Sequence, residues 1–223
     1  RSGRVTGVQT CALPIFNGSL SDLEKAILLD SEQWRYVQKL SLKYYGEGEY
    51  DKAIKVVEPY YLKHRGNFHV GDTYLKILIA QKQYRKADKV IEGMRILPFE
   101  GQTGSHVMWR DIKLHLAAEC IDKGNYKAAL SRVEEALQWP ENLGVGKPYD
   151  DLIDISSETL LWAVIYQRMG DSAKAEEYMS AIRDDDGSKV VFFKTATTKV
   201  NGKYPKVSQM LGNMDSSLDK KLS

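Results

Sequence analysis

Apolar residues recur at intervals of three and four positions through most of this chain, which is the spacing of one face of an α-helix. The clearest example is a pair of such segments, at about 32–45 and 50–64, separated by a short polar stretch. Gly48 lies in that stretch, where a sharp turn favours a residue that tolerates positive φ. The pattern therefore predicts a helical hairpin whose inward-facing residues are Val37, Leu40, Tyr44, Ala53, Ile54, Val57, Tyr60 and Tyr61.

A short motif that ends in alanine follows each of the predicted turns. The segments GEYDKA, KQYRKA, GNYKAA and GDSAKA end at Ala53, Ala87, Ala129 and Ala175. The first two alanines are 34 residues apart, and the next intervals, 42 and 46, equal 34 plus insertions of 8 and 12. A small side chain is needed where two helices cross closely, so we expect all four alanines to be buried.

The two insertions coincide with proline- and glycine-rich stretches, Leu97–His106 and Trp139–Asp151. Insertions at successive repeats emerge on one edge of a repeat array, so we expect these two loops to touch each other. Phe99 and Trp139 should then be at least partly buried, because proline and aromatic content favours ordering.

A helix–turn–helix unit of 34 residues resembles the tetratricopeptide repeat. The resemblance implies an all-α fold, a right-handed solenoid of tetratricopeptide-like helical hairpins. We expect an array over 17–186, with units at about 34–67, 68–97, 110–140 and 156–183. Ser21–Leu29 has a serine or aspartate cap and is typical of the second helix of a preceding unit. Residues 187–223 are interpreted as a degraded terminal hairpin and a polar tail.

The first residues differ in character from all that follows. Val5–Ile15, VTGVQTCALPI, has no periodicity, and it can be back-translated into a common sequencing-library adapter. We therefore interpret 1–16 as an artefactual segment and exclude it from the fold. On this interpretation, the chain is the C-terminal fragment of a larger protein.

A second resemblance rests on ILPFEG at Ile96–Gly101 and WPENLGVGKPYD at Trp139–Asp150. With these motifs, about residues 20–185 resemble the C-terminal repeat region of large, mainly bacterial proteins. Those proteins carry a β-sandwich-rich front part, similar to carbohydrate-active enzymes, ahead of a helical repeat array. The resemblance implies this architecture and an association with carbohydrate metabolism, and it transfers no catalytic residue.

Composition narrows the classes of partner. The formal net charge of +2 gives no basic footprint for nucleic acid or for an anionic membrane surface, and no apolar run is long enough to span a bilayer. With Cys11 set aside, Cys120 stands alone in an apolar helical pattern, which favours a buried small residue over a reactive thiol. We take the cytoplasm as the default compartment.

No combination of residues predicts catalysis by this segment. GVGKP at Gly144–Pro148 resembles part of a phosphate-binding loop, but Glu141 and Pro148 stand where glycine and serine or threonine are required. The histidines are dispersed, without the spacing of a metal site. We therefore expect no enzyme activity, no metal and no cofactor.

Two sets of residues are candidates for binding. The first helices of successive repeats line the concave face of a repeat array, which is its usual binding surface. There the sequence places Arg35, Gln38, Tyr45, Asp72, Lys76, Asp111 and Gln167, together with Leu42, His69, Leu114, Ala118, Leu160 and Val164. The second set lies in the two loops and comprises Glu100, His106, Glu141, Asn142 and Lys147. These loops either form a polar site or only pack together as an apolar cluster.

The expected function is that of a helical-repeat scaffold that mediates contact with another protein or with another domain of the same parent chain. The alternative is an accessory segment of a carbohydrate-processing enzyme whose catalytic β-rich part is missing, with carbohydrate bound through the parent. The concave-face candidates lack the concentrated Lys, Asn and Arg set that clamps the C-terminal carboxylate of a peptide, so a receptor for free chain ends is not expected.

Overall fold

A computed structural model describes residues 19–98, 103–150 and 153–183. Within these ranges the chain is all-helical and has no strand, as the periodicity predicts. The predicted segments 1–16 and 187–223 lie outside the described residues. The helices are α1 (Leu20–Leu29), α2 (Trp34–Gly46), α3 (Tyr50–Lys63), α4 (Phe68–Ala80), α5 (Tyr84–Gly93), α6 (Gly104–Asp122), α7 (Tyr126–Ala136), the 3₁₀ turn η1 (Glu141–Leu143), α8 (Ser156–Met169) and α9 (Ser172–Arg183).

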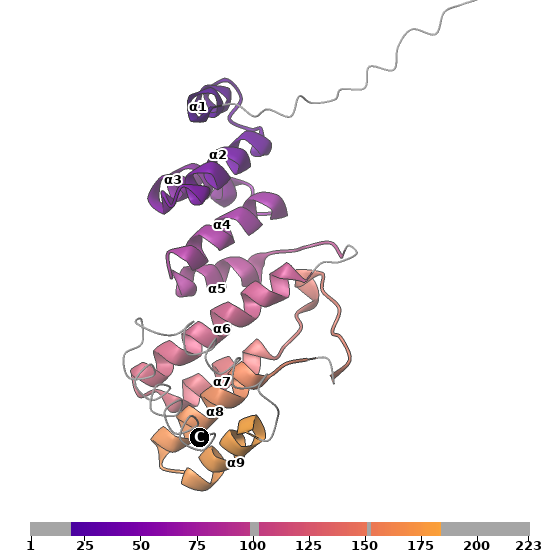
Figure 1. Ribbon diagram of the computed structural model, residues 1–223. Helices are drawn as coiled ribbons and strands as arrows, with labels where there is room; N and C mark the ends of the chain where they lie inside the picture. Colours follow the sequence, from indigo (N-terminus) through magenta and orange to yellow (C-terminus); the bar gives the residue numbers. More distant parts are fainter. Residues whose placement is uncertain (1–18, 99–102, 151–152, 184–223) are drawn as a thin grey trace, which may run out of the picture.

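Each helix packs against the next one along the chain, and the helices follow one another from α1 at one end to α9 at the other (Figure 1). Tight turns join α2 to α3, α4 to α5, α6 to α7 and α8 to α9. The first helices of these pairs also touch one another, since α4 contacts both α2 and α6, and α6 contacts α8. Helix α6 begins at Gly104, earlier than the predicted unit start at 110, because the helix already includes the last three residues of the first insertion.

The backbone reverses in the same way in all four tight turns. Gly48, Gly124 and Gly170 have φ values of 76°, 77° and 85°, and Lys82 occupies the equivalent position with φ 58°. The first helix begins differently from the prediction, because its N-cap is Ser19, whose side chain accepts from the amide of Asp22 in a capping box. Local capping therefore begins α1 one residue before the predicted start.

The four alanines after the turns are buried, as predicted, at 0% exposure for Ala53, Ala87 and Ala129 and 6% for Ala175. Around them the apolar faces form two core clusters, one over α3 to α6 and one over α6 to α9. Cys120 is half-buried against the second cluster, and burial raises the pKa of its thiol. The alanines permit close helix contact, and the larger apolar residues fill the space beside them.

Buried charges connect the middle helices, a feature that the hydrophobic pattern does not reveal. Lys113 of α6 is 0% exposed and pairs with Asp88, Glu92 and Glu135, from α5 and α7, at 2.6, 2.8 and 2.9 Å. Arg132 also pairs with Asp88 and Glu135. Such a network fixes the register of three helices, because removing one partner would leave an uncompensated buried charge.

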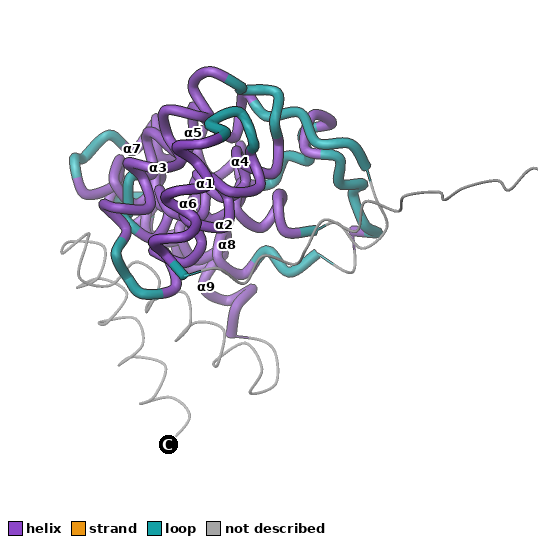
Figure 2. Tube along the Cα trace, turned by 90° about the horizontal axis from the view of Figure 1, so that it is seen from above, coloured by secondary structure: helices purple, strands orange, loops and turns teal. Residues whose placement is uncertain are grey.

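The two loops contact each other, as predicted, and both views place them on one side of the helices (Figures 1 and 2). The backbone amide of Ile96 donates to the backbone carbonyl oxygen of Asn142 at 2.8 Å. The hydroxyl of Ser105 donates to the backbone carbonyl oxygen of Leu143 at 3.0 Å. Trp139 is half-buried, as expected, whereas Phe99 lies outside the described residues. The loop after α5 is thus tied to the loop after α7.

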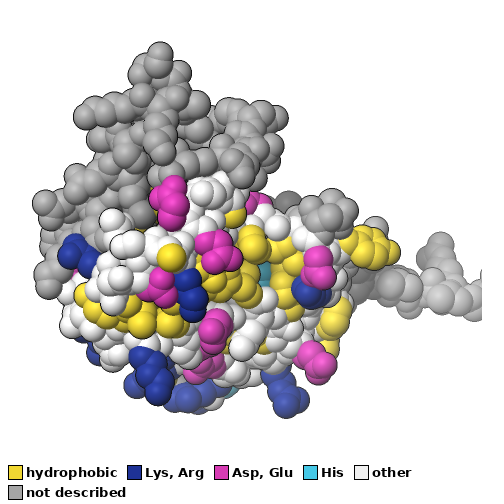
Figure 3. All heavy atoms as spheres, turned by 90° about the horizontal axis from the view of Figure 1, so that it is seen from below, with side chains coloured by type: hydrophobic (Ala, Val, Ile, Leu, Met, Phe, Trp, Pro, Cys, Tyr) yellow, Lys and Arg dark blue, Asp and Glu magenta, His cyan; other side chains and the backbone are white. Residues whose placement is uncertain are grey.

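At the α9 end, hydrophobic side chains form a band across the surface with charged side chains on either side (Figure 3). Helices α8 and α9 meet there through a cluster of half-buried aromatic rings. The ring of Tyr178 lies 5.3 Å from that of Trp162 and 5.6 Å from that of Tyr166. This cluster extends the second core toward the surface.

Candidate binding groove

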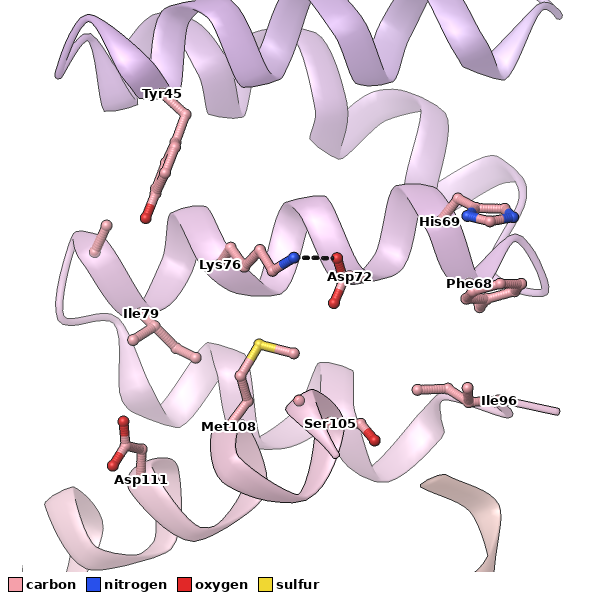
Figure 4. A pocket seen from close by; sticks show the side chains of 12 residues that line it. Tyr45, Phe68, His69, Asp72, Lys76, Ile79, Ile96, Ser105, Met108 and Asp111 are labelled. Carbon is pink, nitrogen blue, oxygen red and sulfur yellow. Dashed lines mark ion pairs between the residues drawn. The ribbon is translucent and has the colours of Figure 1, made fainter. Parts of the chain in front are cut away.

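A groove of about 680 Å³ runs between α2, α4 and α6, the first helices of three successive pairs (Figure 4). The loop that leads into α6 closes one end through Ile96. Figure 4 shows the side chains of Asp72 and Lys76 on α4 in the middle of the groove, with Tyr45 on one side and Met108 on the other. The lining residues are Tyr45, Phe68, His69, Asp72, Lys76, Ile79, Ala80, Ile96, Gly104, Ser105, Met108 and Asp111.

The sequence of α4 explains why it supplies most of this lining. Phe68, Asp72, Lys76 and Ile79 are three or four residues apart, so they share one face of the helix. Most other positions in this helix are buried, including Val70, Tyr74, Leu75, Ile77 and Leu78. Helix α4 is therefore held on several sides and exposes one stripe of mixed polarity to the groove.

The groove has a paired charge at its centre and a second carboxylate beside it. Lys76 Nζ lies 2.7 Å from Asp72 Oδ2, with the two side chains 48% and 31% exposed. Asp111 of α6 also lines the groove, so the lining carries two carboxylates and one ammonium group. With His69 neutral, the formal charge of the lining is −1.

Stacked rings continue the groove toward the start of α2. The ring of His69 is parallel to that of Trp34, with centroids 4.7 Å apart, and lies 3.9 Å from that of Phe68. The guanidinium group of Arg35 covers Trp34 at 4.6 Å. Phe68 and His69 also line a shallower hollow of about 470 Å³ with Trp34 and Tyr60, so the groove leads into an aromatic surface.

The structure brings together four of the seven polar candidates that the sequence places on the concave face: Tyr45, Asp72, Lys76 and Asp111 all line the groove. Arg35 and Gln38 lie nearby without lining it. Gln38 links two helices, because its amide donates to the carbonyl oxygen of His69 at 3.2 Å and to the hydroxyl of Thr73 at 3.3 Å. Gln167 is exposed on α8 and is not part of the groove.

Four apolar residues that the sequence placed on the same face were assigned wrongly. Leu114, Ala118, Leu160 and Val164 are buried, at 9, 0, 2 and 0% exposure. They belong to the core cluster that α6 to α9 share. Helix α8 packs against both α6 and α7, so these positions face neighbouring helices instead of solvent.

A second hollow, of about 530 Å³, lies where the two loops meet α6. His106 and Lys147 both line it, together with Trp139, Arg110 and Asp154. His106 Nε2 lies 3.1 Å from the carbonyl oxygen of Gln138, which can only accept, so Nε2 carries the hydrogen. The guanidinium group of Arg110 already forms an ion pair with the buried carboxylate of Glu158.

The remaining loop candidates do not converge on this hollow. Asn142 is tied inward, because its side-chain amide donates to the carbonyl oxygen of Met94 at 2.8 Å. Glu141 is exposed and does not line the hollow. Lys147, which does line it, pairs with Asp150 at 2.6 Å. Glu100 lies outside the described residues. Of the five loop candidates, the structure therefore brings two together.

Sequence reasoning missed several groove residues. Phe68, Ile79 and Met108 fit the helical core pattern, and only the packing of α4 on α6 shows that they stay half-exposed. The buried ion pairs of Lys113, which lies outside the groove, were also missed. The sequence around a lysine within an apolar helix does not indicate which residues of other helices will pair with it. Each of these positions depends on which helix lies opposite, which local periodicity does not encode.

Within the described residues, no cluster of three or more His, Cys, Asp or Glu side chains is arranged to hold a metal ion. In the same part of the chain, no helix is both long and apolar enough to cross a membrane. Neither a comparison with models of protein families nor a search of curated proteins found a match to this sequence.

Proposed function

We propose that this chain is a helical-repeat scaffold of the tetratricopeptide type, and that it holds a segment of another protein or domain in the groove between α2, α4 and α6. The proposal rests mainly on one observation, namely which helices supply the side chains that line the groove. Its side chains come from the first helices of three successive helix pairs, together with the loop into α6. The role is binding and not catalysis.

The recurrence of local features supports a repeat of the tetratricopeptide kind. Buried alanines follow the turns at 53, 87, 129 and 175, and positive φ occurs in each turn at 48, 82, 124 and 170. The 34-residue interval between the first two alanines matches the length of that repeat. A right-handed solenoid is the arrangement that such units adopt when they stack.

The groove also has the mixed character of a surface that binds protein. It combines apolar side chains, such as Ile79 and Met108, with the Asp72–Lys76 pair and the hydroxyl of Tyr45. Apolar contacts contribute most of the affinity in such sites, and a few polar groups fix the register of the ligand. The burial of the other faces of α4 holds Ile79 and the Asp72–Lys76 pair in place without a ligand.

A photo-crosslinking experiment in cells tests this function. Tyr45 is replaced by p-benzoylphenylalanine, which preserves an aromatic ring in the groove. Lys89, exposed on α5 and outside the groove, receives the same replacement as the matched control. We expect the Tyr45 site to capture one defined segment, identified by mass spectrometry, and the Lys89 site to capture none of it. Identical products from both sites would contradict the proposal.

The captured segment also separates the two functions that the sequence leaves open. A segment from a different protein supports a scaffold between chains. A segment from a β-rich domain encoded upstream in the same gene supports the accessory role, in which the helices support a carbohydrate-processing domain.

A further inference from the structure

Two residues of the groove are held by a loop that follows the next helix pair. Ile96 and Ser105 line the groove and lie on the same side of it (Figure 4). The backbone amide of Ile96 donates to the backbone carbonyl oxygen of Asn142, and the hydroxyl of Ser105 donates to the backbone carbonyl oxygen of Leu143. Both acceptors belong to η1 (Glu141–Leu143), the turn in the loop after α7, which we call the strap.

The side chain of Leu143 fixes the strap to the core of the preceding helices. It is 1% exposed and belongs to the core cluster over α3 to α6, although the residue itself follows α7. Ile96 is a member of the same cluster. A unit of a repeat array usually packs only against its neighbours. The strap therefore adds a contact that joins the loop before α6 to the loop after α7.

The strap also reaches α4, through Met94. The side-chain amide of Asn142 donates to the carbonyl oxygen of Met94 at 2.8 Å. The side chain of Met94 is 2% exposed and packs against α4 at Gly71, where a Cβ atom would lie 3.4 Å from the Met94 methyl carbon. The strap is thus connected to α4 through Met94 and to α6 through Ser105, and these helices are the two walls of the groove.

The spacing between these walls matters for binding. Helices α4 and α6 touch each other only slightly, so their spacing depends on groups that hold both. A ligand binds with lower apparent affinity when the competent arrangement of its site is populated for only part of the time. An element that keeps both walls in place therefore raises the affinity without touching the ligand.

We propose that Asn142 and Leu143 are positioning residues for the groove, and that the strap fixes the spacing between α4 and α6. The strap does not line the groove, so it acts on binding indirectly. This inference rests on the proposed function and gives the insertion between α7 and α8 a role in it.

Two variants weaken the strap, and two matched variants leave it intact. Leu143→Ala removes its side chain from the core, and Asn142→Ala removes the side-chain bond to Met94. Glu141→Ala is the control within the turn, because that side chain is exposed. Leu161→Ala is the control for lower stability, because it deletes a leucine that is 4% exposed in the core cluster over α6 to α9.

The first readout uses the free chain and needs no ligand. Weakening the strap should speed hydrogen exchange of the Ile96 amide at least about tenfold relative to Leu161→Ala, because the local opening becomes easier. It should also shift the methyl NMR signal of Met108, which lines the groove, and leave that of Met179, which is buried in the second core cluster. Neither control should shift the Met108 signal.

The second readout is the yield of the segment that p-benzoylphenylalanine at position 45 captures in cells, normalised to the amount of chain. Leu143→Ala should lower this yield at least about fivefold, and both controls should stay within about twofold, because only the strap variants depopulate the competent groove. Leu143→Met should restore the yield, because a methionine of similar volume refills the same space. Asn142→Ala provides the same test if Leu143→Ala does not fold.

The results separate this inference from the function on which it rests. An unchanged Met108 signal in the strap variants, or an equal shift in Leu161→Ala, would overturn the inference. A shifted Met108 signal with an unchanged capture yield would also overturn it, because the spacing would then not affect binding. If the unmodified chain captures no segment, the proposed function fails, and the free-chain readouts alone decide whether the strap sets the spacing of α4 and α6.

Discussion

The imidazole ring of His106 lies flat against the indole of Trp139, with centroids 3.4 Å apart and planes 8° apart. The stack joins the start of α6 to the loop after α7, and it buries the imidazole. Burial lowers the pKa of His106 below its ordinary value of 6.5, because the charged form loses hydration. The contact between the loops is therefore coupled to pH.

The coupling has a definite sign. Because the folded chain holds His106 neutral, the unfolded chain binds the extra proton as the pH falls below 6.5. The free energy of unfolding should then decrease by at most about 1.4 kcal/mol per pH unit for this one proton. Urea titrations between pH 7.5 and 5.5 measure it. His106→Phe retains an aromatic ring without a titrating group, so its stability should fall less over this range; an equal fall would contradict the assignment.

Gly144 tests how closely the loops pack. Its φ is 65°, and a Cβ atom there would lie 2.5 Å from the carbonyl oxygen of Ile96. Gly124 is the matched control, since its φ is 77° and a Cβ atom would meet nothing within 4 Å. Gly124→Ala should cost about 1–2 kcal/mol from backbone conformation alone, and Gly144→Ala should cost clearly more. Equal losses of unfolding free energy would mean that the two loops are not in close contact.

Lys82 is the one described residue other than glycine with positive φ, at 58°. The equivalent positions in the other turns are glycines. Lys82→Gly should therefore raise the free energy of unfolding by up to about 1 kcal/mol, because relief of the left-handed strain exceeds the entropy cost of glycine. Thermal unfolding monitored by circular dichroism measures the change, and a lower melting temperature would show that the lysine side chain matters more than the backbone.

The buried network around Lys113 predicts a large loss of stability. Burial opposes the charged form of Lys113, but hydrogen bonds to Asp88, Glu92 and Glu135 outweigh it and raise the pKa of the ammonium group. Lys113→Met leaves these carboxylates without their main cation and should cost about 3 kcal/mol or more in chemical denaturation.

The matched control for that variant is Lys147→Met. Lys147 pairs with Asp150 at the surface, where the two side chains are 53% and 85% exposed. A pair of this kind contributes at most about 1 kcal/mol. Comparable losses in the two variants would show that the buried network does not contribute to holding α5, α6 and α7 together.

The helices and their turns could be predicted from the sequence because their causes are local. The spacing of Ala53 and Ala87 sets the register, and glycine at 48, 124 and 170 marks positions of positive φ. The contact between the loops was also predictable, because insertions at successive repeats share one edge. These inferences need no knowledge of which helix lies opposite.

The residues that line the groove were only partly predictable because their exposure depends on tertiary packing. Asp72 and Lys76 both line the groove, since one helix face determines the position of both. Leu160 and Val164 occupy equivalent positions on α8 but are buried, because α8 packs against both α6 and α7. Periodicity identifies the face of a helix, and the neighbouring helices decide whether that face is covered.

The most direct test of the central claim, that the groove between α2, α4 and α6 is the binding site, is a methyl NMR titration. The chain is labelled at the methionine methyl groups, and the segment captured by the crosslinker at position 45 is added as a synthetic peptide. Met108 lines the groove, whereas Met169 is 52% exposed at the end of α8. We expect the Met108 signal to shift in a saturable manner while the Met169 signal stays unchanged. Saturable shifts at Met169 with none at Met108 would contradict the account.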